Sequence, residues 1–147
     1  MRHLALTLTE EGRYSDAEIV WRKIIDIQGR GSGKELPAIL TNLGVALIRE
    51  GRYAEAERWM QDAIEKAVRI SGPESADTAL AVYNLACLEA LTRRPDAALS
   101  HLSHAVEHGL PTNDLLGMAT DPDLKSLHGD SRFKELLAQA KEQSAKH

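Results

Sequence analysis

One short pattern returns at a fixed distance in this chain, and this internal repeat restricts the possible folds more than any other feature. The segment Glu11-Gly12-Arg13-Tyr14, followed by Ala17-Glu18, returns 39 residues later as Glu50-Gly51-Arg52-Tyr53, followed by Ala56-Glu57. Repetition at a period of this size is typical of chains that stack several copies of one supersecondary unit.

A second shift, of 42 residues, reveals a third and more divergent copy. It pairs Asn42-Leu43 with Asn84-Leu85, and Ala56 with Ala98. We therefore expect a single domain over residues 1–147, with repeats at about residues 1–28, 36–70 and 75–109 and a tail at about 110–144.

Each copy carries two helical patterns that are separated by a tight turn. In the second copy Leu40, Leu43 and Leu47 recur at helical spacing, Gly51 ends that helix, and a new apolar stripe begins at Ala56. Alanine and leucine supply 40 residues, whereas isoleucine, valine and threonine supply 8, 5 and 7, which favours helix over strand. The sequence therefore predicts an all-α protein built from about three antiparallel helix pairs.

Small residues recur at one position of the second helix in every copy. Ala17, Ala56 and Ala98 occupy this position. A small side chain there lets the two helices of a pair approach closely, so we expect these alanines at the helix contact.

The period stops after residue 110, and the remaining sequence predicts a cap. Phe133, Leu136, Leu137 and Ala140 follow the spacing i, i+3, i+4, i+7, and Asp130 or Ser131 can cap the start of that helix. Arrays of repeats need such a capping element because the last repeat otherwise exposes an apolar face.

These residues resemble the tetratricopeptide repeat family, over about residues 1–110. Leu43-Gly44, Tyr53, Ala56 and Ala63 fall where that family has its signature residues. The spacing of 42 residues and the segment Ser71-Gly72-Pro73-Glu74 are similar to the longer repeats of kinesin light chains and related bacterial proteins. The resemblance implies a right-handed α-solenoid.

The tail also resembles a known element. Asp121-Pro122-Asp123-Leu124 and Arg132-Phe133 are similar to the segment that closes such arrays in many bacterial proteins. The resemblance implies a bacterial origin.

In a stack of helix pairs, the first helices line the concave side and their exposed residues face a ligand. Asn42 and Asn84 occupy one column of this surface, and an asparagine amide can both donate to and accept from a peptide backbone. In the kinesin light chain arrays that the chain resembles, asparagines of this column are associated with peptide binding. The alternative is that each asparagine bonds to the protein's own backbone. The predicted peptide groove comprises Arg2, Leu6, Thr41, Asn42, Val45, Arg49, Tyr83, Asn84 and Cys87.

The groove residues predict the chemistry of the partner. Leu6, Val45 and Tyr83 are apolar or aromatic, so we expect a protein or peptide segment with apolar side chains. Arg2 and Arg49 could attract an acidic group. The family's clamp for the carboxylate of chaperone tails would need cations at the columns of Asn42 and Asn84, and the sequence has none there.

Other candidate sites are weaker. His101, His104 and His108 project from one side of the last repeat helix and could hold Zn²⁺, although a solvated helix face is the simpler interpretation. Cys87 has no neighbouring base that would activate it. Gly29-Arg30-Gly31-Ser32-Gly33-Lys34 lacks the first glycine and the final Ser or Thr of a phosphate loop. We therefore expect no enzyme activity, no cofactor and no metal.

Charge and hydropathy exclude further classes. Lys and Arg number 18 and Asp and Glu number 22, which gives a net charge of −4, and the two signs alternate along the chain. This pattern disfavours nucleic-acid binding, which needs clustered cations. The sequence has no apolar run long enough for a membrane span and no signal peptide, so a cytoplasmic location is predicted.

The sequence thus predicts a noncatalytic protein-protein interaction module. Two alternatives remain open: a self-assembling structural module that forms a homo-oligomer, and a regulatory C-terminal segment of a longer bacterial signalling protein. The first predicted helix is shorter than its counterparts, which fits either an atypical terminal repeat or a fragment of a longer array.

Overall fold

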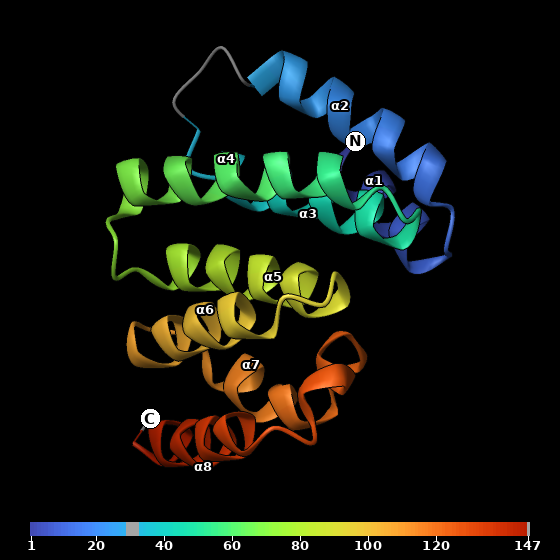
Figure 1. Ribbon diagram of the computed structural model, residues 1–147. Helices are drawn as coiled ribbons and strands as arrows, with labels where there is room; N and C mark the ends of the chain where they lie inside the picture. The colour runs from blue at the N-terminus through green and yellow to red at the C-terminus, as the bar shows by residue number, and fades with distance from the viewer. Residues whose placement is uncertain (29–32, 147) are drawn as a thin grey trace.

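The computed structural model describes residues 1–28 and 33–146, and they form a stack of helix pairs (Figure 1). The pairs are α1 (Arg2–Glu10) with α2 (Tyr14–Gln28), α3 (Leu36–Arg49) with α4 (Tyr53–Ser71), and α5 (Ala76–Leu91) with α6 (Pro95–Glu107). The C-terminal part contains α7 (Thr112–Gly117), the 3₁₀ helices η1 (Met118–Thr120) and η2 (Pro122–Leu127), and α8 (Ser131–Ala145). The predicted all-α solenoid is confirmed.

The two helices of each pair meet at small residues. Ala17, Ala56 and Ala98 are all completely buried, as the sequence predicts. At the same interface of the second pair, a Cβ on Gly44 would lie 2.9 Å from Cγ of Met60. The backbones are therefore close enough that larger side chains at these positions would push the helices apart.

Successive pairs are joined by contacts between the second helix of one pair and the first helix of the next. Leu43 and Leu47 are fully buried in a core that also contains Trp21 and Ile24 from α2. α5 packs against α3, α4, α6 and η2, and 11 of its 16 residues are buried. This helix is the centre of the stack.

The tight turn within each pair requires a left-handed backbone conformation. Gly12 and Gly51 have φ values of +76° and +77° at this place. The third copy keeps the turn with Arg93, at φ +59°. The third copy therefore differs from the first two in the residue at the turn and not in the path of the backbone. A residue other than glycine adopts this conformation at a cost in free energy.

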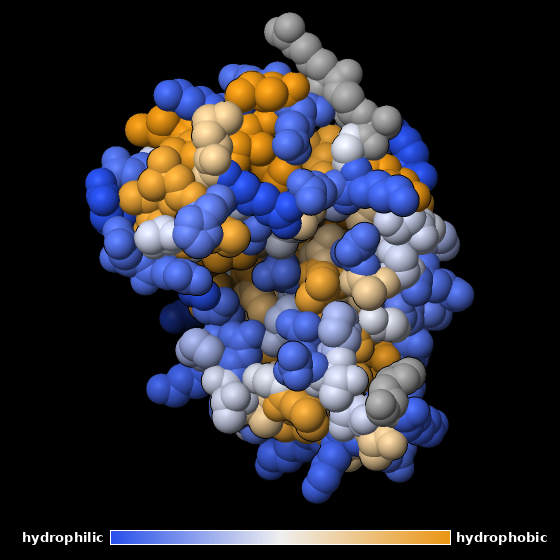
Figure 2. Space-filling model, turned by 180° about the vertical axis from the view of Figure 1, so that it is seen from behind, coloured by the Kyte–Doolittle hydropathy of each residue, from blue (hydrophilic) through white to orange (hydrophobic). Residues whose placement is uncertain are grey.

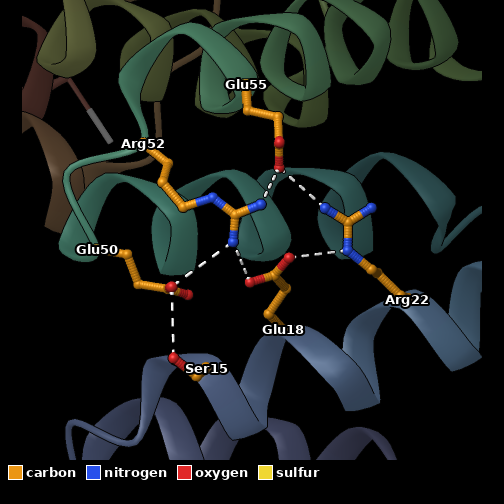
Figure 3. Close-up of polar contacts among 6 residues, drawn as sticks. All are labelled: Ser15, Glu18, Arg22, Glu50, Arg52 and Glu55. Atoms are coloured by element: carbon orange, nitrogen blue, oxygen red, sulfur yellow. Dashed lines mark hydrogen bonds and ion pairs between the residues drawn. The ribbon is translucent and has the colours of Figure 1, made fainter.

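Charged side chains fasten the first repeat to the second (Figure 3). The carboxylate of Glu18 in α2 accepts hydrogen bonds from Arg22, at 2.9 Å, and from Arg52 in the turn before α4, at 2.6 Å. Glu55 in α4 accepts from the same two arginines, at 2.9 and 2.6 Å. A smaller counterpart joins the next two repeats, where Arg94 lies 2.8 Å from Glu57.

This network affects the ionisation of Glu18. Burial raises the pKa of its carboxyl, but hydrogen bonds and positive charge from Arg22 and Arg52 outweigh burial, so the net pKa lies below its ordinary value. Glu18 therefore remains ionised at neutral pH and holds both arginines.

The C-terminal helix covers the last repeat in the way the sequence predicts. Phe133, Leu136 and Ala140 of α8 are buried in one core with residues of α5, α6 and α7. Of the two expected capping residues, Asp130 takes the role: its side chain accepts a hydrogen bond from the backbone N–H of Arg132 at 2.9 Å.

We predict that Ala56→Leu lowers the free energy of unfolding by about 1–3 kcal/mol, because the added atoms have no space between α3 and α4. Urea unfolding followed by circular dichroism measures this change. Ala54→Leu is the matched control, since Ala54 is exposed on the same helix, and it should change stability by less than about 0.5 kcal/mol. Equal effects of the two substitutions would contradict the close helix contact.

We also predict that Glu18→Gln destabilises the protein by about 1 kcal/mol at pH 7, because two charge-assisted hydrogen bonds weaken while the arginines stay partly hydrated. The lowered pKa of Glu18 sets the sign of the pH dependence: its contribution is present above about pH 4.5 and is lost as the pH falls below that value. Urea unfolding of both proteins at pH 7 and pH 3.5 should show a smaller difference in stability at pH 3.5 than at pH 7.

Candidate functional site

The first half of α3 and the first half of α5 enclose a pocket on the side predicted to bind a ligand. Its volume is about 220 Å³. Three predicted groove residues, Thr41, Asn42 and Asn84, lie together in its wall. The full lining is Pro37, Ala38, Thr41, Asn42, Asp77, Leu80, Ala81 and Asn84.

The two asparagines differ in their hydrogen bonds. The amide nitrogen of Asn84 donates to the backbone oxygen of Leu80 at 2.9 Å, which is the intramolecular alternative considered from the sequence. Its side-chain oxygen is left to accept. Asn42 is half-buried and makes no side-chain hydrogen bond within residues 1–28 and 33–146, so both its donor and its acceptor can serve a ligand. The hydroxyl of Thr41 donates to the oxygen of Pro37 at 2.9 Å.

The second half of α5 is not an open groove, because η2 lies against it (Figure 1). The Tyr83 hydroxyl donates to the carboxylate of Asp121 at 2.6 Å, and the Cys87 thiol donates to the same oxygen at 3.8 Å. The hydroxyl of Ser126 donates to the backbone oxygen of Ala90 at 3.2 Å. The prediction that Tyr83 and Cys87 face a ligand is therefore wrong: the chain's own C-terminal segment covers them.

Burial changes the acidity of both covered side chains. Burial, and after it the charges of Asp121 and Asp123, raise the pKa of the Cys87 thiol well above its ordinary range. The pKa of Tyr83 is raised by burial first, then by Cys87 and Asp121. Both groups stay protonated at neutral pH and act as hydrogen-bond donors to Asp121.

The two arginines expected to attract an acidic ligand are paired within the protein. Arg49 makes two hydrogen bonds to Asp123, at 2.8 and 3.0 Å. Arg2 lies 2.9 Å from Glu35. The charged residue in the wall of the pocket is instead Asp77, so the expectation of an acidic partner group is not supported at this place.

The remaining predicted groove residues lie outside the pocket. Leu6 is exposed on α1, and Val45 is half-buried against the core of the first two repeats.

The sequence prediction missed two residues of the pocket wall, Asp77 and Ala81. They fall at i−7 and i−3 from Asn84 and so share its helix face. No local pattern in the sequence indicated that Asp121 and Asp123 would contact α5, because a contact between the tail and α5 spans more than 30 residues of sequence.

The three histidines do not converge on one point. Nδ1 of His101 lies 2.5 Å from the buried carboxylate of Glu89, whereas the rings of His104 and His108 pack on each other with centroids 4.4 Å apart. Within the described residues, three potential metal ligands come together elsewhere, namely Cys87, Asp121 and Asp123. Asp121 already accepts hydrogen bonds from Tyr83 and Cys87, and Asp123 already accepts from Arg49.

In the glycine-rich segment Gly29 to Lys34, residues 29–32 lie outside the described residues.

Comparison with known proteins agrees with this architecture. A family model described as tetratricopeptide repeat matches residues 35–108, which is half of the chain and includes the pocket. The chain belongs to the tetratricopeptide repeat family. Repeats of this family are generally protein-protein interaction modules that bind proteins or peptides, and they are typically noncatalytic scaffolds.

A solved structure shares the fold of this tetratricopeptide repeat protein. The crystal structure of BtubC (BKLC) from P. vanneervenii aligns with a TM-score of 0.76 and 22% sequence identity, over 97% of this chain and 61% of that chain. This chain thus spans about three fifths of the length of BtubC. A comparison with curated proteins found no match. Among the residues that the structure describes, no helix is both long and apolar enough to cross a membrane.

We predict that the native Cys87 thiol reacts with Ellman's reagent at pH 8 at least about 100-fold more slowly than the same thiol in urea, because it is buried and its pKa is raised. Absorbance during the reaction measures the rate. A Cys87→Ala, Thr120→Cys variant provides a control with an exposed thiol. Rapid labelling of the folded wild-type protein would show that η2 does not hold its place on α5.

Proposed function

We propose that this chain is a noncatalytic module that binds an extended segment of another protein in the pocket between α3 and α5. One observation carries the proposal: Asn42 and Asn84, which belong to different repeats, lie in the wall of the same pocket. The placement is the one expected of residues that contact successive parts of one peptide.

The asparagines supply polar groups for recognition of a peptide backbone. Asn42 can donate to a peptide carbonyl and accept from a peptide N–H. The free oxygen of Asn84 can accept a second N–H one repeat further along. Such bonds are made with backbone groups, so they position a peptide without depending on its sequence.

The size and lining of the pocket determine which kind of side chain a bound peptide should insert. Pro37, Ala38, Leu80 and Ala81 give apolar walls, and about 220 Å³ is enough for one large aliphatic or aromatic side chain. The carboxylate of Asp77 favours an N–H group or a cation beside that side chain and disfavours an acid. We therefore expect an apolar residue next to neutral or basic residues.

The segment from Asp121 to Leu127 limits the length of the groove. It covers α5 beyond Tyr83, and Arg49 of α3 is bound to it through Asp123. A bound peptide should therefore run from the pocket toward α1 rather than along the whole of α5.

The test is selection of peptides from a phage library of random linear sequences on the wild-type protein, followed by affinity measurement by fluorescence polarisation. Asn42→Ala combined with Asn84→Ala should weaken binding of the selected peptides by about tenfold or more, because two hydrogen bonds to the peptide are lost. Ala38→Trp should abolish binding by filling the mouth of the pocket, since Ala38 is exposed in the unbound protein.

Asn113→Ala is the matched control, because Asn113 is exposed on α7, away from the pocket. This substitution should leave the affinity unchanged. Circular dichroism and urea unfolding show whether each variant is folded. Unchanged affinity of folded proteins carrying the double substitution or Ala38→Trp, or failure to select any peptide, would contradict the proposal.

A further inference from the structure

Two of the three histidines of the last repeat lie together at the end of α6. The rings of His104 and His108 have centroids 4.4 Å apart, and their planes are inclined by 35°. The two residues are four apart and share one helix face, where His104 is exposed and His108 is half-buried. A Zn²⁺ ion binds imidazole nitrogen at about 2.0–2.1 Å, so rings at this separation allow one nitrogen of each to reach the same ion.

His101 does not belong to this pair. Its Nδ1 lies 2.5 Å from the carboxylate of Glu89, which is buried in α5. The sequence pattern places the three histidines in one set on a solvated face, whereas the structure ties His101 to the core and leaves the other two rings together. A candidate ligand pair is therefore His104 with His108.

A carboxylate from a different element faces the ring of His108. Glu74 lies in the loop between α4 and α5, and its Oε1 is 3.3 Å from Nδ1 of His108. This arrangement favours the tautomer of neutral His108 that carries its proton on Nδ1, which leaves the lone pair of Nε2 for a metal. Histidines that bind metals are commonly oriented by a carboxylate in this way.

The position of Glu74 is fixed by a close contact between two backbones. Gly109 follows the end of α6 and has φ +105°, and a Cβ at this residue would lie 3.2 Å from the backbone oxygen of Glu74. The same Cβ would lie 3.8 Å from the backbone nitrogen of Ala76, the first residue of α5. Glycine suits both the conformation and the close approach. Packing of the loop on the end of α6 thus brings Glu74 to His108.

The charge around the two rings favours a cation. A pocket of about 480 Å³ borders His108, and its lining includes the carboxylates of Glu74 and Glu107. Among the described residues, no lysine or arginine lines it. Figure 2 shows hydrophobic surface gathered over the first repeat and mostly hydrophilic surface over the C-terminal half of the molecule. Two carboxylates on a hydrophilic surface attract a hydrated cation and repel an anion.

We propose that His104 and His108 bind one divalent transition-metal ion, with Zn²⁺ as the probe for this class, and that Glu74 is a positioning residue for His108. Imidazole is a preferred ligand of Zn²⁺, whereas Ca²⁺ and Mg²⁺ prefer oxygen. Water would fill the remaining coordination positions. The site is separate from the pocket between α3 and α5, so it stands or falls independently of peptide binding.

The first test is isothermal titration of the chain, without a histidine tag, with Zn²⁺ at pH 7.5. We expect one ion per chain with a Kd of about 1–100 µM, because two ligands supply roughly half the binding free energy of a four-ligand zinc site. His104→Gln and His108→Gln should each weaken binding by about tenfold or more. His3→Gln is the matched control, since His3 is exposed on α1, and it should change the affinity by less than about twofold. Lack of binding up to about 1 mM, or unchanged affinity in the His104 and His108 variants, would overturn the proposal.

A pair of carboxylate variants tests the role of Glu74. Glu74→Gln should weaken Zn²⁺ binding by about tenfold, as expected when the group that orients a histidine ligand is lost. Glu107→Gln removes the same charge from the same pocket, but the carboxylate of Glu107 accepts a hydrogen bond from Ser103 at 3.4 Å and does not face His108. It should weaken binding by less than about threefold. Equal effects of the two substitutions would reduce Glu74 to a general electrostatic contribution and contradict its positioning role.

Proton NMR of the histidine rings locates the ion in the unaltered chain. As Zn²⁺ is added, the ring signals of His104 and His108 should change together and before those of the other histidines. The signal of His101 should stay in place, because its ring is bound to Glu89. A first response at His3 or His128 would place the ion elsewhere and overturn the proposal.

Discussion

The close contact between the two helices of each pair is the constraint on which the remaining structure depends. Ala17, Ala56 and Ala98 are completely buried, and Gly44 leaves no space for a side chain beside Met60. Because the paired backbones lie so close, each pair forms a thin unit that can hide its apolar side chains only by stacking on a neighbour. The pocket and the cap are both results of that stacking.

The sequence predicted the repeated elements well, because their signals are local and periodic. Helix pairs, the buried alanines and the cap at Asp130 follow from spacings of three to four residues and from a shift that recurs. In the divergent third repeat, Arg93 adopts the turn conformation that Gly12 and Gly51 adopt in the first two. The observed fold thus follows largely from short-range patterns.

The candidate site was predicted only in part, and the reason is physical. Asn42 and Asn84 share a pocket because the repeat places them in one column. Tyr83 and Cys87 belong to the same surface by repeat alignment, but Asp121 binds both of them from a segment outside the repeats. Such contacts depend on where the tail folds back onto the repeats. The tail does not share the repeat period, so aligning the repeats could not predict these contacts.

The bridge between Arg49 and Asp123 alters how the stack responds to disturbance. In a simple solenoid every repeat touches only its immediate neighbours, so segments can separate one at a time. Here a side chain of the second repeat reaches past the third to the C-terminal segment, 74 residues away in sequence. This ion pair adds a direct link between the second repeat and the C-terminal segment to the contacts between neighbouring repeats, so that opening of the cap also breaks a contact of α3.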